Sequence, residues 1–213
     1  CTATATVSAT VNPLPVASAT TNPSTACQGT SFSLTASGGG TYAWSSGLGT
    51  GASKTVTPNI TTTYTVTVTN ASGCTATTTV SVTVNALPVA SATATPAAAC
   101  SGTSFSLNAS GGGTYSWNSG LGSGASKAVT PNVSTTYTVT VTNTAGCTAT
   151  AAIMVTVYPM PLANAGPDKE LCQGNSVSLT ASGGIQYNWN NNAGSTAAIM
   201  VTPSVTTTYT VTV

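Results

Sequence analysis

The chain has 213 residues, of which three are Lys, two are acidic and none is His, so its formal net charge is +1. This composition excludes the basic surface that nucleic acids and anionic membranes bind. It also removes most of the side chains that general acid–base catalysis needs. We therefore predict that the chain is not an enzyme, and we predict no catalytic residue, cofactor, metal site or membrane span.

The sequence repeats itself with a period of about 73 residues. Cys27, Cys100 and Cys172 each begin a Cys-x-Gly-x-Ser-φ-Ser-Leu stretch, where φ is apolar, at spacings of 100 − 27 = 73 and 172 − 100 = 72. A second cysteine series, formed by Cys1, Cys74 and Cys147, has the same phase. Such self-similarity is typical of modular arrays. We predict the final strand of a preceding module at 1–14, two modules at 15–87 and 88–159, and a third at 160–213 that lacks its final strand.

Each module reads as a series of short strands separated by Gly, Pro and Asn turns. In the first module the expected strands are residues 16–20, 31–37, 42–44, 54–57, 63–69 and 74–84, with a loop at 45–53. Strict alternation in 31–37 places Phe32, Leu34 and Ala36 on one face. Several short strands, each with its own turn signal, predict an all-β fold of tandem Ig-like antiparallel sandwiches.

Two aromatic series recur at the module period. We predict that both belong to the core, as the third-strand Trp and a corner Tyr of an Ig-like sandwich do. The alternative for the tryptophans is a platform for stacking sugars. The residues are Trp44, Trp117, Trp189, Tyr64, Tyr137 and Tyr209.

The six cysteines favour disulfides, because the chain has neither CxxC nor His for a zinc site. On the expected strand order the two cysteines of one module lie at opposite ends of the sandwich. A bond between modules, Cys27 with Cys147, is therefore slightly preferred, and Cys1, Cys74, Cys100 and Cys172 would pair with modules beyond the segment. Pairing within modules, Cys27–Cys74 and Cys100–Cys147, remains open. Either pattern implies an extracellular or periplasmic location, and we expect the cell surface.

The last two strands of the first module carry threonine on their outward faces. Thr is a good solvent-facing strand residue, and we prefer the interpretation that these threonines only face solvent. The alternative is a hydroxyl array that is glycosylated or that grips ice or surface polysaccharide. The array comprises Thr63, Thr65, Thr67, Thr75, Thr77 and Thr79.

Residues 1–7 match the segment that begins at Cys74, whereas the other end stops at the equivalent of Val68. We weigh two explanations. The preferred one is a continuous giant chain of which this is one repeat. The other is that one subunit's first strand completes the last module of the next subunit by strand addition. In both cases the expected partners are neighbouring copies or modules, joined head to tail.

The recurring motifs are Cys-x-Gly-x-Ser-φ-Ser-Leu-x-Ala-Ser-Gly-Gly, Tyr-x-Trp, Thr-Thr-Tyr-Thr-Val-Thr-Val and Gly-Cys-Thr-Ala-Thr. Together they resemble the Ig-like and PKD-like tandem modules of giant Bacteroidota cell-surface proteins, and residues 161–169 resemble the start of a PKD module. The resemblance implies export by type IX secretion and kinship with gliding-motility adhesins. We expect a structural or adhesive repeat segment of an extracellular stalk or filament. The alternative is a ligand-binding module that grips carbohydrate or ice through its threonine faces.

Overall fold

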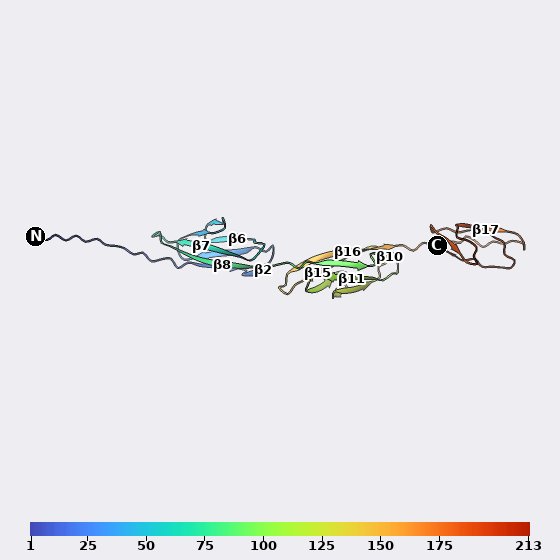
Figure 1. Cartoon of the computed structure of the whole chain (residues 1–213), viewed down its shortest axis with the longest axis horizontal. Coiled ribbons are helices and arrows are strands. Elements are labelled where there is room, and N and C mark those ends of the chain that lie inside the picture. The colour runs from blue at the N-terminus through green and yellow to red at the C-terminus, as the bar shows by residue number, and fades with distance from the viewer. The chain divides into compact units, whose positions relative to one another are not determined.

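The computed structural model describes residues 1–213 and consists of strands, turns and extended segments, with no helix (Figure 1). No helix in it is therefore long and apolar enough to cross a membrane. One compact unit comprises Cys1–Ala94, Leu107–Lys127 and Thr136–Ile153, and the other comprises Thr95–Ser106, Ala128–Thr135 and Met154–Val213. The disulfide and the groove described below each lie within one of these units.

The first sandwich consists of a three-stranded and a five-stranded sheet, ordered β1-β3-β6 and β2-β8-β7-β4-β5. All pairings are antiparallel except that of β2 with β8, which is parallel. The strands are β1 (Ser18–Asn22), β2 (Thr25–Cys27), β3 (Phe32–Ser37), β4 (Thr41–Trp44), β5 (Gly49–Thr50), β6 (Ser53–Val56), β7 (Thr62–Thr69) and β8 (Thr75–Asn85).

The core of the first sandwich lies between these two sheets and follows the alternation in the sequence. Phe32 and Leu34 of β3 are fully buried, as are Val66 of β7 and Val82 of β8. Thr and Ser occupy the intervening positions, which face outward. Burying every second residue of a strand removes apolar surface from water at about 25 cal/mol per Å², which stabilises the pairing of the two sheets.

The second sandwich repeats the strand orders of the first, as β14-β11-β9 and β10-β16-β15-β12-β13. Its buried residues, including Phe105, Leu107 and Val139, stand at the same repeat positions as those of the first. The strands are β9 (Ser91–Thr95), β10 (Ala98–Cys100), β11 (Phe105–Ser110), β12 (Thr114–Trp117), β13 (Gly122–Ser123), β14 (Ser126–Val129), β15 (Thr135–Thr142) and β16 (Thr148–Tyr158).

The third sandwich has fewer and shorter strands. β17 (Val177–Thr180) pairs with β19 (Ala198–Val201), and β18 (Asn188–Trp189) pairs with β20 (Val211–Thr212). A small core of Trp189, Ile199, Val201 and Val211 lies between them. Residues 160–213 contain no counterpart of β2 or β8.

The all-β prediction and the Ig-like sandwiches are confirmed, but the strand bounds differ in detail. The first strand begins at Ser18 rather than Val16, and the expected loop at 45–53 contains the short strand β5. Strand β2 and its repeat β10 were not predicted. Residues 1–17 form no strand, so the assignment of 1–14 to a preceding module, like the other module boundaries, stays a prediction.

Candidate functional site

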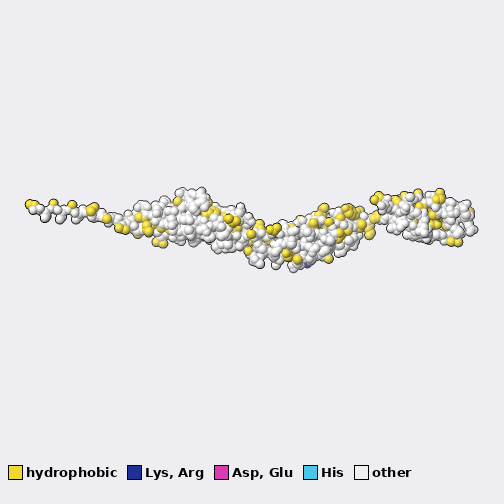
Figure 2. Space-filling view, in the orientation of Figure 1, with side chains coloured by type: hydrophobic (Ala, Val, Ile, Leu, Met, Phe, Trp, Pro, Cys, Tyr) yellow, Lys and Arg dark blue, Asp and Glu magenta, His cyan; other side chains and the backbone are white.

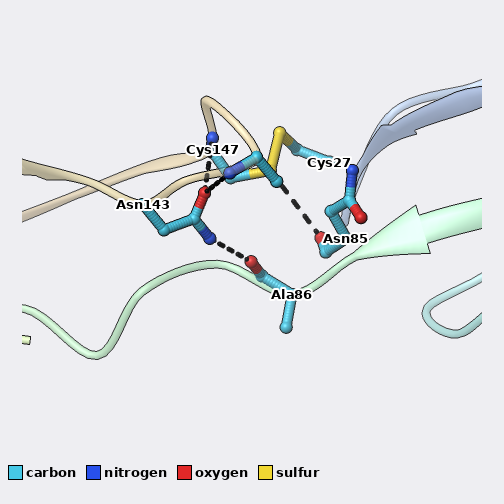
Figure 3. Close-up of a disulfide and its surroundings, with 6 residues drawn as sticks. Cys27, Asn85, Ala86, Asn143 and Cys147 are labelled. Carbon is cyan, nitrogen blue, oxygen red and sulfur yellow. Dashed lines mark hydrogen bonds between the residues drawn. A yellow bond between two sulfur atoms is a disulfide. The ribbon is translucent and has the colours of Figure 1, made fainter. Parts of the chain in front are cut away.

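A disulfide joins Cys27, at the end of β2, to Cys147, in the turn between β15 and β16 (Figure 3). The two Cα atoms are 5.6 Å apart, and the bond spans 120 residues of sequence. It therefore links the first sandwich to the last hairpin of the second. Neither bond of the within-module pattern forms, and Cys1, Cys74, Cys100 and Cys172 carry free thiols.

The short strand β2 places Cys27 at this position. It runs parallel to the end of β8, with Cys27 opposite Asn85, and the main-chain N–H of Gln28 donates to the carbonyl of Asn85 at 2.9 Å. Asn85 is the last residue of β8, where the chain leaves the first sandwich. Cys27 is therefore held beside the linker that enters the second sandwich.

Asn143 organises the other half of the junction. Its Oδ1 accepts hydrogen bonds from the main-chain N–H groups of Ala145 and Cys147, both at 3.0 Å. Its Nδ2 donates to the carbonyl oxygen of Ala86 at 2.9 Å (Figure 3). One amide thus fixes the turn that carries Cys147 and binds the linker that follows β8.

The same arrangement recurs one repeat earlier, around Asn70. Its Oδ1 accepts from the N–H groups of Ser72 and Cys74 at 3.1 and 2.9 Å, and its Nδ2 donates to the carbonyl oxygen of Pro13 at 2.9 Å. Residues 12–13 therefore contact the first sandwich as residues 85–86 contact the second. In this copy Cys74 has no partner cysteine, and its thiol donates to the carbonyl oxygen of Asn12 at 3.7 Å.

The role of these asparagines was not predicted from the sequence. Turns of Gly, Pro and Asn were predicted between the strands, and such a turn connects β7 with β8 and β15 with β16. An Asn whose side-chain oxygen bonds main-chain N–H groups two residues on is typical of such turns. The signal that could have identified the junction is the fixed four-residue spacing between each Asn and its Cys.

A groove of about 690 Å³ opens in the third sandwich. Its apolar lining includes Val177, Leu179, Trp189, Val201 and Tyr209, and residues 165–171 form one side of it. In the first sandwich the corresponding core is covered by Ala26 of β2 and by Val80, Val82 and Val84 of β8.

The threonines of β7 and β8 form facing pairs. Thr65 lies opposite Thr79, Thr67 opposite Thr77, and Thr69 opposite Thr75. Thr63 faces Ser81 and donates to its hydroxyl at 3.3 Å. Figure 2 displays a face with scattered hydrophobic side chains and few charged ones. The first sandwich therefore presents a regular, uncharged array of hydroxyl and methyl groups.

This array is interrupted in the second sandwich. The positions that correspond to Thr79 and Ser81 are Ala152 and Met154, and Met154 is 58% exposed. The second sandwich therefore lacks hydroxyl groups at two of the outward positions that carry them in the first.

The three tryptophans lie in the cores of their sandwiches. Trp44, Trp117 and Trp189 are 6%, 4% and 3% exposed. Each indole N–H donates to a main-chain carbonyl seven residues later, at 2.9 to 3.0 Å. A ring this deeply buried offers no face on which a sugar could stack.

The tyrosines follow the core pattern less completely. Tyr64 and Tyr137 are both 6% exposed, whereas Tyr209 is only partly buried and lines the groove. In this sandwich the hydroxyl of Tyr187 donates to the main-chain carbonyl oxygen of Gly184 at 2.7 Å.

No family model matches this chain, and no curated protein matches it. Among solved structures it is similar to murine CEACAM1b, with 14% identity and a TM-score of 0.32 over 67% of this chain and 100% of that one. It is similar to a 1.5-MDa bacterial ice-binding adhesin, with 14% identity and a TM-score of 0.32 over 90% and 88% of the two chains. A Ca2+-stabilized ice-binding adhesin of an Antarctic bacterium gives 12% identity and 0.33 over 87% and 63%.

At these TM-scores the likeness assigns no function. A function has to be argued from the residues and bonds of this chain. Its distinctive features are the disulfide, the two asparagine junctions, the uncharged threonine face and the open groove. No three His, Cys, Asp or Glu side chains gather in it. The arrangement can hold segments together, covalently and through main-chain hydrogen bonds.

Proposed function

We propose that this chain is a non-enzymatic repeat segment of a secreted cell-surface protein, and that it forms part of a stalk or extracellular filament. Its task is mechanical, to hold or join other parts without being unfolded. The resemblance of its motifs supports the finer assignment to a Bacteroidota protein of the type IX-secreted, gliding-motility-adhesin kind. An extracellular location agrees with the oxidised pair Cys27–Cys147, because such bonds persist in oxidising compartments.

The observation that carries this proposal is the 120-residue span of the disulfide. Tension applied to the two ends of the chain passes through the Cys27–Cys147 bond instead of through residues 28–146. These residues include β3 to β8 and most of the second sandwich. The bond therefore shields most strands of the two sandwiches from extension, whereas β1 (Ser18–Asn22) and β16 (Thr148–Tyr158) lie outside the closed loop.

The period of the repeat strengthens this argument. A link that spans 120 residues in an array whose period is 100 − 27 = 73 residues overlaps the next link. If every repeat formed the same bond, each residue of the array would lie inside at least one closed loop. An array of this kind extends little under load even where a sandwich unfolds.

Single-molecule force spectroscopy tests the proposal directly. We expect the oxidised 213-residue chain, pulled from its termini, to extend less than the reduced chain by the length of 120 residues. At about 3.6 Å per residue this difference is about 430 Å. Equal extensions in the two states would exclude a mechanical role for the bond.

A second candidate function is ligand binding through the threonine face. The observation in its favour is the register of β7 and β8, which sets Thr65, Thr67 and Thr69 directly opposite Thr79, Thr77 and Thr75. Strands lie about 4.8 Å apart, so the hydroxyl groups form a regular lattice suited to ice or a polysaccharide.

Ice-recrystallisation and polysaccharide-binding assays on the 213-residue chain distinguish the two functions. We expect no activity from the chain if the threonines only solvate the sheet. Activity that is abolished by Thr67→Glu, and retained by Thr35→Glu on the exposed side of β3, would establish the second function.

A further inference from the structure

The two cysteines of the disulfide lie in different surroundings. Cys147 is 1% exposed, whereas Cys27 is only partly buried. A disulfide is reduced when a thiolate attacks one of its sulfur atoms, and the rate depends on which sulfur is attacked and on access to it. The difference in exposure therefore makes Cys27 the accessible end of the bond.

The position of Cys27 in the sheet explains its exposure. Its strand, β2, is the first in the order β2-β8-β7-β4-β5, so one side of β2 pairs with β8 and the other side faces away from the sheet. Residues 28–30, which follow Cys27, are all exposed. Cys27 thus lies at a sheet edge that a small molecule in solution can reach.

Hydrogen bonds close the hairpin turn around Cys147. The main-chain N–H of Asn143 donates to the carbonyl oxygen of Cys147 at 2.9 Å, and the N–H of Cys147 donates to Oδ1 of Asn143 at 3.0 Å. The N–H of Gly146 donates to the main-chain carbonyl oxygen of Asn143 at 3.0 Å. The turn therefore fixes both main-chain polar groups of Cys147.

The linker that leaves the first sandwich lies beside the sulfur atom of Cys147. The carbonyl oxygen of Asn85 is 3.9 Å from this Sγ, and the next residue, Ala86, accepts the hydrogen bond from Nδ2 of Asn143 at 2.9 Å (Figure 3). A carbonyl oxygen carries partial negative charge and disfavours a nearby thiolate. The linker therefore shields Cys147 from an attacking thiolate, and Asn143 holds the linker in place.

We propose that Cys27 is a site of thiol–disulfide exchange, at which a low-molecular-weight thiol of the glutathione type opens and closes the bond to Cys147. The thiolate of the small molecule attacks Sγ of Cys27. The bond between the two cysteines breaks, and Cys147 leaves as a thiolate that takes a proton from water. A second small thiolate then attacks the small-molecule sulfur of the mixed disulfide on Cys27. This step releases the Cys27 thiolate and the disulfide of the small thiol.

Closure of the bond follows the same steps in reverse. The Cys27 thiolate attacks the disulfide of the small thiol and expels one thiolate, which leaves a mixed disulfide on Cys27. The Cys147 thiolate then attacks Sγ of Cys27 and expels the second small thiolate. The two cysteines therefore have different roles, since Cys27 reacts with the external thiol and Cys147 reacts only with Cys27.

The junction around Asn70 indicates how a reduced hairpin cysteine is held. Asn70 donates to the carbonyl oxygen of Pro13 at 2.9 Å although Cys74 is a free thiol. That thiol donates to the carbonyl oxygen of Asn12 at 3.7 Å. By repeat position, the linker after β8 should hold a reduced Cys147 in the same way. The thiol then stays in place for closure, and no refolding is needed.

The exchange site rests on the proposed mechanical function for its biological use. The state of Cys27 decides whether the loop spanned by the disulfide, 120 residues in sequence separation, is closed. A thiol that acts at Cys27 therefore sets how far the chain extends under load.

Trapping the mixed disulfide tests the proposal on the unaltered 213-residue chain. The oxidised chain is treated briefly with reduced glutathione, the exchange is stopped with acid, and N-ethylmaleimide blocks the remaining thiols in denaturant. Peptide mapping by mass spectrometry locates the glutathione. We expect it on Cys27, with N-ethylmaleimide on Cys147, at least about ten times more often than the reverse. Equal amounts, or an excess on Cys147, would overturn the proposal.

Two single variants measure each cysteine when the mixed disulfide cannot close. Cys147→Ala leaves the Cys27 thiol, and Cys27→Ala leaves the Cys147 thiol. With oxidised glutathione we expect Cys27 to react at least about ten times faster in the folded chain, and the two rates to agree within about twofold in denaturant. Equal rates in the folded chain would contradict the exchange site. Unequal rates in denaturant would assign the difference to neighbouring sequence instead of to the fold, and would contradict it as well.

A matched pair of asparagine variants tests the shielding of Cys147. Asn143→Ala frees the linker, so the preference for Cys27 in the trapping experiment should fall at least about threefold. Asn132→Ala, at an exposed position, is the control and should keep the preference of the parent chain. An unchanged preference in Asn143→Ala would refute the shielding on which the proposal depends.

The exchange site and the mechanical function can fail separately. Exchange at both sulfur atoms, together with a large oxidation-dependent difference in extension, would refute the exchange site and keep the mechanical role. Exchange at Cys27 alone, without that difference, would do the reverse.

Discussion

The side-chain amide of Asn143 donates a hydrogen bond to the main-chain carbonyl oxygen of Ala86 at 2.9 Å. The two residues are 57 positions apart, and the bond joins the final hairpin of the second sandwich to the linker that leaves the first. Asn70 makes the same bond to Pro13 across the same separation. The junction is therefore a repeated element of the chain, as regular as its strands.

Replacing Asn143 with Ala should loosen this junction. The substitution removes two acceptor bonds and one donor bond of a partly exposed residue, and we expect the free energy of unfolding to fall by about 1–2 kcal/mol. Chemical denaturation measures the change. Asn132→Ala, at an exposed position without such bonds, is the control and should shift stability by less than about 0.5 kcal/mol. Equal shifts in both variants would show that the Asn143 bonds contribute nothing.

Removing the disulfide should have a larger effect. A closed loop of about 120 residues lowers the conformational entropy of the unfolded chain. Because a Cys27→Ala, Cys147→Ala double variant loses this loop, its free energy of unfolding should fall by about 4–5 kcal/mol at most. Thermal denaturation with and without reductant measures it. Thr144→Ala, in the same turn as Cys147, is the control and should respond to reductant as the parent chain does. A double variant with unchanged stability would mean that the bond does not restrain the unfolded state.

Two adjacent glycines should respond differently to the same substitution. A Cβ at Gly40 would overlap the main-chain carbonyl of Thr69, whereas a Cβ at Gly39 meets nothing within 4 Å. Gly39 has a φ of +71°, in the left-handed region where a Cβ crowds the following carbonyl oxygen. Gly39→Ala should therefore lower the free energy of unfolding by only about 1–2 kcal/mol. Gly40→Ala must also displace backbone, and we expect it to cost at least about 2 kcal/mol more. Denaturant midpoints of the two variants compare them, and equal midpoints would contradict the close approach.

The core and the long strands could be predicted because their signal is local. The alternation around Val66 and Val68 identifies the buried face of β7 from the sequence alone, and both side chains are fully buried. A period of two requires only neighbouring residues to be known.

Strand β2 could not be predicted, because its three residues Thr25–Cys27 are too few to show a period. They are ordered by parallel pairing with Thr83–Asn85, which lie 58 residues later. For the same reason the amide of Asn143 could be assigned to a turn but not to Ala86. Contacts that depend on distant chain segments leave no local pattern.

Equivalent leucines in the first and third sandwiches should differ in their cost of truncation. Leu34 is fully buried, and Leu34→Ala should destabilise the first sandwich by about 2–5 kcal/mol. Leu179 stands at the same repeat position but lines the open groove, so part of its side chain already meets water. Leu179→Ala should therefore cost less than about 2 kcal/mol, since less apolar surface returns to solvent.

Hydrogen exchange followed by mass spectrometry, with peptides from each sandwich, measures both changes in one chain. The chain with a copy of residues 69–85 appended after Val213 provides the decisive comparison. Filling the groove should bury Leu179 and raise the cost of Leu179→Ala toward that of Leu34→Ala, while leaving Leu34→Ala unchanged. If Leu179→Ala lowers stability equally with and without the appended residues, those residues do not pack on Leu179.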